Sequence, residues 1–137
     1  MSYIYTVGAQ TLASGLDWTT HADGFRAYAF AGDFDDVLHQ ILSDVEASDL
    51  LGFASLSARS LVAVTGGRGF DCADFSIPNV TGTVKGVLIV RWDSASSGEN
   101  SPLIAYIDDG LPLVLSNQAL NVTVSAGGLF SVTADNA

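Results

Sequence analysis

Basic side chains are scarce in this chain: five lysines and arginines stand against fifteen aspartates and glutamates, which gives a formal net charge of −10. The phosphate backbone of nucleic acids and an anionic membrane surface would both repel such a protein. Charged residues make up only 15% of the chain, whereas hydrophobic residues make up 48%. We therefore expect a packed domain with a weakly charged surface and with neither a nucleic-acid nor a membrane partner.

Cysteine is also nearly absent, since Cys72 is the only one. This excludes an internal disulfide framework and a metal site built from several cysteines. No apolar run approaches the roughly 20 residues of a membrane-spanning helix, and no charged segment followed by an apolar one opens the chain as in an export signal. We therefore expect a protein that is made in the cytoplasm and is not exported.

The most β-prone stretch of the sequence extends from Val80 to Asp109. It contains two apolar runs, Gly86–Trp92 and Leu103–Ile107, which a polar segment rich in Ser, Gly and Asn separates. This pattern predicts a hairpin with a long loop. In the first run, alternation places Val87, Ile89 and Arg91 on one face and Leu88, Val90 and Trp92 on the other. Two largely apolar faces predict a central strand.

Several shorter segments have the same period-two character. In the segment Phe25–Ala31, alternation places Ala27 and Ala29 on one face and Tyr28 and Phe30 on the other. We expect a strand over Phe25–Ala31, a hairpin turn at Gly66–Gly69, a strand that ends at Pro78, and two final strands over Leu120–Val124 and Leu129–Val132. One segment differs, because its apolar residues recur every three or four positions, as on one face of a helix. The members of this stripe are Phe34, Val37, Leu38, Ile41, Leu42 and Val45. With Asp33 as N-cap, they predict one amphipathic helix.

About eight short strands and one helix predict a mainly β fold, an antiparallel β-sandwich that is jelly-roll-like, with the helix covering one face or end. The length of 137 residues suits a single domain. We divide the chain into an N-terminal strand or arm, residues 1–12, and a single β-sandwich domain, residues 13–137.

Residues with catalytic or metal-binding chemistry are few and scattered. His21 and His39 are the only histidines, and neither is close to Cys72 in sequence. Neighbouring aspartates such as Asp108 and Asp109 point to opposite faces of a strand, which does not suit a pair of catalytic carboxylates. We predict no catalytic residue, no cofactor and no metal ligand. A calcium site built from loop aspartates and a cysteine hydrolase that uses Cys72 are the alternatives.

Aromatic and apolar residues near the N-terminus are the candidates for an interface. Most aromatic side chains of a domain pack in its core, but a terminal arm can present them to a neighbouring subunit. The candidate interface residues are Tyr3, Ile4, Tyr5, Val7 and Trp18.

The order of these features from Phe25 to Val132 resembles a family of small virion proteins of tailed bacteriophages and prophages. The matching phrases are FRAYAFA, LSDV, FDCADFSIPNVTGTVKGVLIVRWD, SPLIAYIDDG and a final Gly-Leu-Phe. Cys72 and Ala73 depart from the Asp-Ala-Asp phrase of the family. The resemblance implies a non-enzymatic decoration or cement protein that binds the major capsid protein outside the head shell.

The same resemblance implies a homotrimer on the capsid surface of the virion, because local threefold axes are natural positions for such a protein. A tail, neck or receptor-binding module would share these sequence features. A carbohydrate-binding module that uses exposed tryptophan and tyrosine is a further alternative.

Overall fold

A computed structural model of the chain describes residues 2–4, 18–33, 35, 38–65, 67–108, 110–126 and 128–133. These residues form ten strands and three 3-10 helices of three residues each, and they contain no helix of seven or more residues. All strand pairs are antiparallel. The prediction of a mainly β, antiparallel protein is confirmed.

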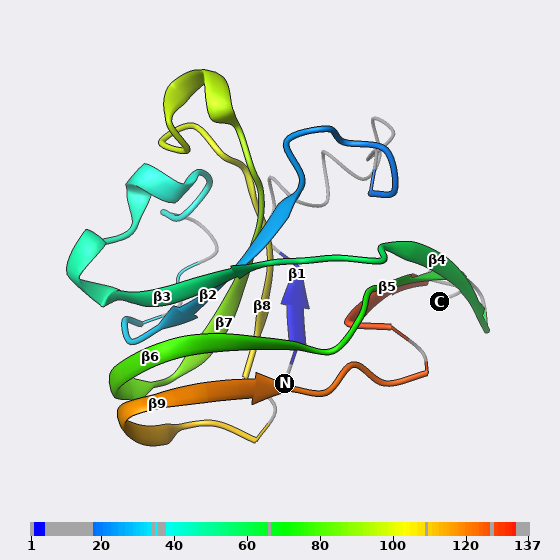
Figure 1. The fold of residues 1–137 in the computed structure, drawn as a ribbon. Coiled ribbons are helices and arrows are strands. Elements are labelled where there is room, and N and C mark those ends of the chain that lie inside the picture. Colours follow the sequence, from blue (N-terminus) through cyan, green and yellow to red (C-terminus); the bar gives the residue numbers. More distant parts are fainter. Residues whose placement is uncertain are drawn as a thin grey trace.

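The largest sheet has five strands in the order β1-β8-β7-β2-β3 (Figure 1). Its members are β1 (Ser2–Ile4), β8 (Leu103–Ile107), β7 (Gly86–Arg91), β2 (Phe25–Phe30) and β3 (Leu50–Ser55). Strands β7 and β8 form the predicted hairpin, and a loop that contains the 3-10 helix Ser94–Ser96 connects them. Strand β7 lies in the middle of the sheet, as its two apolar faces predicted.

Two smaller sheets complete the fold. Strands β6 (Phe75–Val84) and β9 (Leu113–Val122) form a two-stranded ribbon, drawn in green and orange in Figure 1. Strands β10 (Phe130–Thr133), β5 (Gly67–Asp71) and β4 (Ser60–Val64) form a three-stranded sheet that extends to one side of the molecule. The β4–β5 hairpin lies where the glycine-rich turn was predicted.

The main core lies between the five-stranded sheet and the β6–β9 ribbon. One face of the sheet contributes Ala27 and Ala29 from β2 and Val87 and Ile89 from β7. The ribbon contributes fully buried residues of β6 and one buried residue of β9: Ile77, Val80, Val84 and Leu120. Burial of these apolar side chains on both sides joins the ribbon to the sheet.

A second core covers the opposite face of the same sheet. It contains Tyr28 and Phe30 from β2 and Leu88 and Val90 from β7, so the alternation predicted for both strands is confirmed. Leu42 and Val45, from the segment that precedes β3, pack on this face. The sheet is therefore buried on both sides near its centre.

The segment that contributes Leu42 and Val45 is not the predicted amphipathic helix. Its described residues form only the 3-10 helices Leu42–Asp44 and Ala47–Asp49. The backbone around Ile41 pairs instead with the start of β8: the Leu42 N–H donates to the Ser101 carbonyl at 2.9 Å, and the Leu103 N–H donates to the Gln40 carbonyl at 3.0 Å. Because these groups are committed to a neighbouring strand, the helical i to i−4 bonds cannot form here.

One prediction about the strands was also wrong. Strand β6 does not end at Pro78, because a register shift between Ile77 and Val80 places this proline in an irregularity of the ribbon where no ladder hydrogen bond is needed. The last two strands lie near their predicted positions but do not pair with each other. Strand β9 pairs with β6, and β10 pairs with β5.

Candidate functional site

The thiol of Cys72 does not have the environment of a nucleophile. Its side chain is buried in the main core, 6% exposed. Burial, with smaller contributions from the carboxylates of Asp71 and Asp74, raises the pKa of this thiol from the usual 9.0 to about 11. A thiol with this pKa is protonated at neutral pH, whereas the thiolate is the reactive form. Cys72 is therefore a core residue.

The two histidines make different contacts. The Nε2 atom of His21 lies 2.7 Å from the carbonyl oxygen of Trp92, the residue that directly follows β7. The ring of His39 lies edge-on to the ring of Phe30, with centroids 6.2 Å apart. The described residues contain no group of three His, Cys, Asp or Glu side chains that could hold a metal ion.

Two aspartates of the described residues accept hydrogen bonds from the backbone of loops. An oxygen of Asp74 accepts a hydrogen bond from the Val124 N–H at 2.8 Å, and Asp93 accepts one from the Ala95 N–H at 3.2 Å. The first bond joins the segment before β6 to the segment after β9, and the second holds the turn after β7. They use the carboxylates as structural acceptors.

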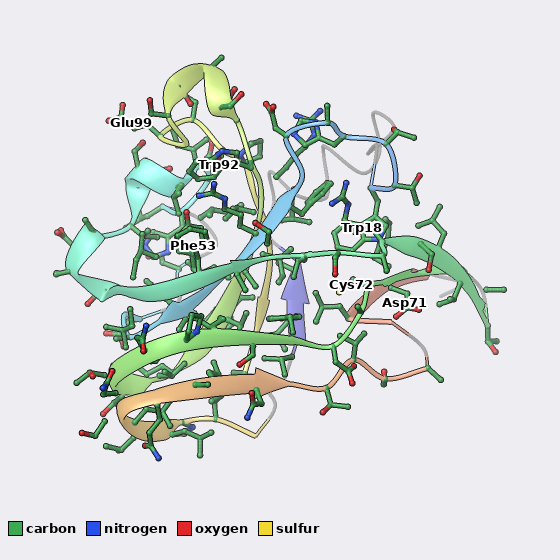
Figure 2. All side chains as sticks on the ribbon, in the orientation of Figure 1. Trp18, Phe53, Asp71, Cys72, Trp92 and Glu99 are labelled. Carbon is green, nitrogen blue, oxygen red and sulfur yellow. The ribbon has the colours of Figure 1, made fainter. Side chains whose placement is uncertain are left out.

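Trp18, predicted as an interface residue, belongs to the core of its own chain and is only 1% exposed. Its indole N–H donates to the carbonyls of Ser60 and Asp71, each at 3.0 Å. Figure 2 shows Trp18 beside Cys72 and Asp71, where β4 and β5 join the rest of the molecule. The interface prediction for Trp18 is wrong, because almost no surface of this side chain remains for a partner.

Arg59 fixes the loop around Trp18. Its guanidinium donates to the backbone carbonyls of Trp18, Leu56 and His21 at 2.7, 3.0 and 3.2 Å. An arginine that bonds three carbonyls cross-links the chain segments that carry them. This cation therefore has a structural role.

The other candidate interface residues lie at the N-terminus. Tyr3 and Ile4 belong to β1, which pairs with β8 of the same chain in the register Tyr3 to Tyr106 and Ile4 to Ala105. Of the two alternatives, strand or arm, residues 2–4 therefore form a strand. Tyr5 and Val7 lie outside the described residues.

An aromatic cluster lies on the face of the five-stranded sheet that carries the second core. The guanidinium of Arg26 is placed 3.5 Å from the ring centroid of Trp92 and 4.4 Å from that of Phe53. A cation in this position is attracted by the electron-rich faces of both rings. Because Arg26 covers one face of the indole, this face of Trp92 is not available to stack on a sugar ring.

The loop after β7 holds Trp92 from another direction. Gly98, at φ +87°, lies against the six-membered ring of Trp92, and a Cβ at this position would overlap the ring. Figure 2 shows Trp92 between the β7–β8 loop, which carries Glu99, and Phe53 of β3. The aromatic residues here pack the loop onto the sheet.

A different surface, formed by β9 and the turns at its two ends, is the strongest candidate for binding. No charged residue occurs between Asp109 and Asp135, although the rest of the chain carries a large excess of acidic groups. Most of β9 is exposed, including Leu113 and Val114, whose exposed fractions are 45% and 78%. Within the described residues, β9 pairs only with β6, so its other edge has no strand partner there. We call this uncharged region the β9 surface.

The β9 surface contains a groove with a volume of about 390 Å³. Its lining is largely apolar and includes Val87, Ile107, Leu111, Leu113, Leu120 and Leu129. The exposed polar residues Asn121, Thr123 and Ser125 also line it. An apolar depression with a few polar groups is the usual form of a binding site in proteins.

Sequence reasoning missed the β9 surface, although one signal for it was present. The uncharged stretch from residue 110 to residue 134 is visible in the sequence, but its importance depends on the exposure of β9. The same composition in a buried strand would indicate only core packing.

Comparisons with known proteins give no relative: no protein-family model, no curated protein and no solved structure matches this chain. Within its described parts, the chain has no helix long and apolar enough to cross a membrane.

Proposed function

We propose that this protein is a non-enzymatic structural component of a bacteriophage virion, a decoration or cement protein that binds the major capsid protein on the outside of the head shell and stabilises it. The observation that carries the proposal is the presence of large exposed apolar side chains on different strands. These are Phe53 on β3, Leu61 on β4, and Leu113 and Val114 on β9. A subunit with neighbours on several sides needs several such surfaces.

The resemblance of the segment from Phe25 to Val132 to small virion proteins supports the same role. The weak charge of the chain suits contacts that depend on apolar area and backbone pairing, because exposed ion pairs contribute little. The one exposed ion pair with described partners, Lys85 with Asp33 at 3.0 Å, illustrates this point, since Asp33 is almost fully exposed. A tail, neck or receptor-binding position is the alternative within the same class.

We further propose that the fold is a β-sandwich. The packing of the β6–β9 ribbon against one face of the five-stranded sheet, with Val84 and Val87 in their shared core, supports this description. The jelly-roll-like connectivity stays a prediction. In the particle, the protein would form a homotrimer at local threefold positions, after synthesis in the host cytoplasm.

The N-terminal segment remains a proposed contact through Tyr3, Ile4, Tyr5 and Val7. Because β1 already pairs with β8, a neighbouring strand would have to add to the outer edge of β1. Deletion of residues 1–7 would remove this edge, so that we expect weaker co-sedimentation with assembled shells. Unchanged co-sedimentation would show that the segment is not a contact.

Two measurements test the decoration role itself. Cryo-microscopy of particles that carry the protein should place it on the outer surface of the head, and a position in the tail would contradict the proposal. Co-sedimentation with shells should persist at an ionic strength of ~1 M, where the Debye length is only ~3 Å, because the proposed contacts are apolar. Loss of binding under this condition would show that charge carries the contact.

A further inference from the structure

We propose that the β9 surface is the site at which a second copy of this chain docks. The inference rests on the self-association contained in the proposed function and names the surface that performs it. The distribution of charge identifies the partner that docks on the β9 surface. The geometry of β9 indicates how this partner makes contact.

The charge distribution selects a second copy as the partner. Two molecules that each have a net charge of −10 repel one another over most of their surfaces. Because the stretch between Asp109 and Asp135 has no charged residue, a second copy that docks there meets no acidic group of this stretch. A strongly basic partner would find no carboxylate to pair with in this part of the chain, which makes it a poorer fit.

The β9 surface also provides the apolar area that such a contact needs. Val114 is the most exposed of the large apolar side chains in the described residues, and Leu113 beside it lines the groove. The exposed apolar residues elsewhere have charged neighbours: Phe53 contacts Arg26, and Leu61 lies next to Ser60, which is paired with Asp71. Leu38 has a charged neighbour as well, because its N–H donates to Asp35. Among the described residues, only β9 therefore combines exposed apolar side chains with a long stretch of chain that has no charged residue.

The backbone of β9 indicates that side chains make this contact. Asn117, in the middle of the strand, has φ +50°, and the register with β6 shifts between Val80 and Gly82. The Ser116 N–H is already occupied, because it donates to the side-chain oxygen of Gln118 at 3.1 Å. These features interrupt the edge of β9 and oppose its extension by a long continuous strand. The second copy would therefore pack its apolar side chains against Val114 and into the groove.

The test uses the purified full chain without any shell, so that failure of self-association is seen separately from failure of shell binding. Sedimentation velocity over a concentration series should give a mass of more than one protomer. The association should strengthen when NaCl screens the repulsion between the two acidic molecules. A mass of two protomers would indicate an isologous contact, and a mass of three would indicate that each β9 surface meets a different surface of the next copy.

Val114→Lys should weaken this association by more than about tenfold in Kd, because it places a charge in an apolar contact. Leu38→Lys is the matched control, since it adds the same charge at an exposed apolar position that belongs to none of the proposed contacts, and it should leave the association unchanged. Thr123→Lys, at an exposed position that lines the groove, is a second variant in case Val114→Lys does not fold. A wild-type protein with a single-protomer mass at every concentration and salt level, or equal effects of Val114→Lys and Leu38→Lys, would overturn the proposal.

Discussion

At the scale of single residues, hydrogen bonding explains why Trp18 is a core residue and not an interface anchor. The indole N–H bridges two carbonyls, of Ser60 in β4 and of Asp71 in β5, and the ring lies 4.6 Å from that of Phe25 in β2. One side chain therefore connects the three-stranded sheet to the five-stranded sheet. The sequence indicates the aromatic character of Trp18 but not the two distant carbonyls that hold it.

We expect Trp18→Phe to destabilise the protein by about 1–3 kcal/mol, because two partly buried hydrogen bonds lose their donor. Unfolding in urea, followed by circular dichroism, measures this loss. Leu38→Ala is the control: the side chain is 71% exposed, so the change should stay within about 0.5 kcal/mol. Equal losses in the two variants would show that the hydrogen bonds of Trp18 contribute nothing.

The buried thiol of Cys72 makes stability depend on pH in the alkaline range. Burial raises its pKa from the usual 9.0 to about 11, so the folded protein holds the proton to a higher pH than the unfolded chain does. The resulting stabilisation is complete below about pH 9 and is lost as the pH rises towards 11. Cys72→Ala lacks this group and provides the reference.

We expect the difference in unfolding free energy between the wild type and Cys72→Ala to decrease between pH 9 and about pH 11, the range set by the shifted pKa. Tyr106, whose pKa burial also raises, is present in both proteins and cancels in the difference. Urea unfolding at a series of pH values gives the curve. A difference that stays constant over this range would show that the thiol titrates normally.

At the scale of elements, the strands could be predicted from sequence where both faces are apolar. In β2 and β7, alternation of side chains assigned Tyr28 and Leu88 to one face and Ala29 and Val87 to the other, and the two cores confirm this division. The pattern was reliable because a shift by one residue would move polar groups such as Arg26 into the main core.

The segment before β3 was predicted wrongly because its apolar spacing fits two structures. Leu42 and Val45 are three residues apart, which suits one face of an α-helix and also suits a short 3-10 helix that packs on a sheet. Tertiary pairing decided between them: the backbone of Gln40 bonds to the first residue of β8, and that of Leu42 bonds to Ser101 just before this strand. A single sequence does not reveal this distant partner, and Leu38 became exposed as a result.

The loop after β7 depends on the contact between Gly98 and Trp92. We expect Gly98→Ala to destabilise the protein more than Gly110→Ala does. Both glycines have positive φ, +87° and +79°, so each alanine incurs about 1–2 kcal/mol of backbone strain. Only the methyl group at position 98 would overlap a ring, whereas nothing lies within 4 Å of the one at position 110.

The added overlap should cost a further ~1–3 kcal/mol, as overpacking usually does. Chemical unfolding measures the difference, and the tryptophan fluorescence of the folded variants reports whether the indole of Trp92 has moved. An equal loss of unfolding free energy in both variants would mean that the loop shifts to accommodate the methyl group and that Trp92 stays in place.

At the scale of the whole molecule, the excess of acidic groups should destabilise the folded state at low ionic strength. Fifteen acidic residues and five basic ones are brought close together on folding, and screening reduces their mutual repulsion. We expect the Tm to rise when NaCl increases from ~0.01 M to ~0.15 M, as the Debye length falls from ~30 Å to ~8 Å. Thermal unfolding at a low protein concentration, where copies do not associate, is the measurement. A lower Tm at the higher salt concentration would show that favourable ion pairs dominate.

The candidate site illustrates why the binding surface could not be read from sequence alone. The uncharged stretch from residue 110 to residue 134 is visible in the sequence, but the groove joins it to Val87 and Ile107 from other strands. Conversely, the sequence predicted an N-terminal strand or arm, and only the structure shows that Tyr3 belongs to a strand of the five-stranded sheet. Both outcomes depend on which strands are neighbours, and this is a property of the tertiary fold.

The pairing of β1 with β8 has a consequence for folding during translation. Ser2 to Ile4 are made before every other strand of this sheet, but their partner, Ile107 to Ala105, is made more than a hundred residues later. Strand β1 therefore cannot pair with the sheet until β8 has been synthesised. Because closure of such a long loop precedes the contacts that stabilise it, we expect docking of β1 to follow formation of the β7–β8 hairpin.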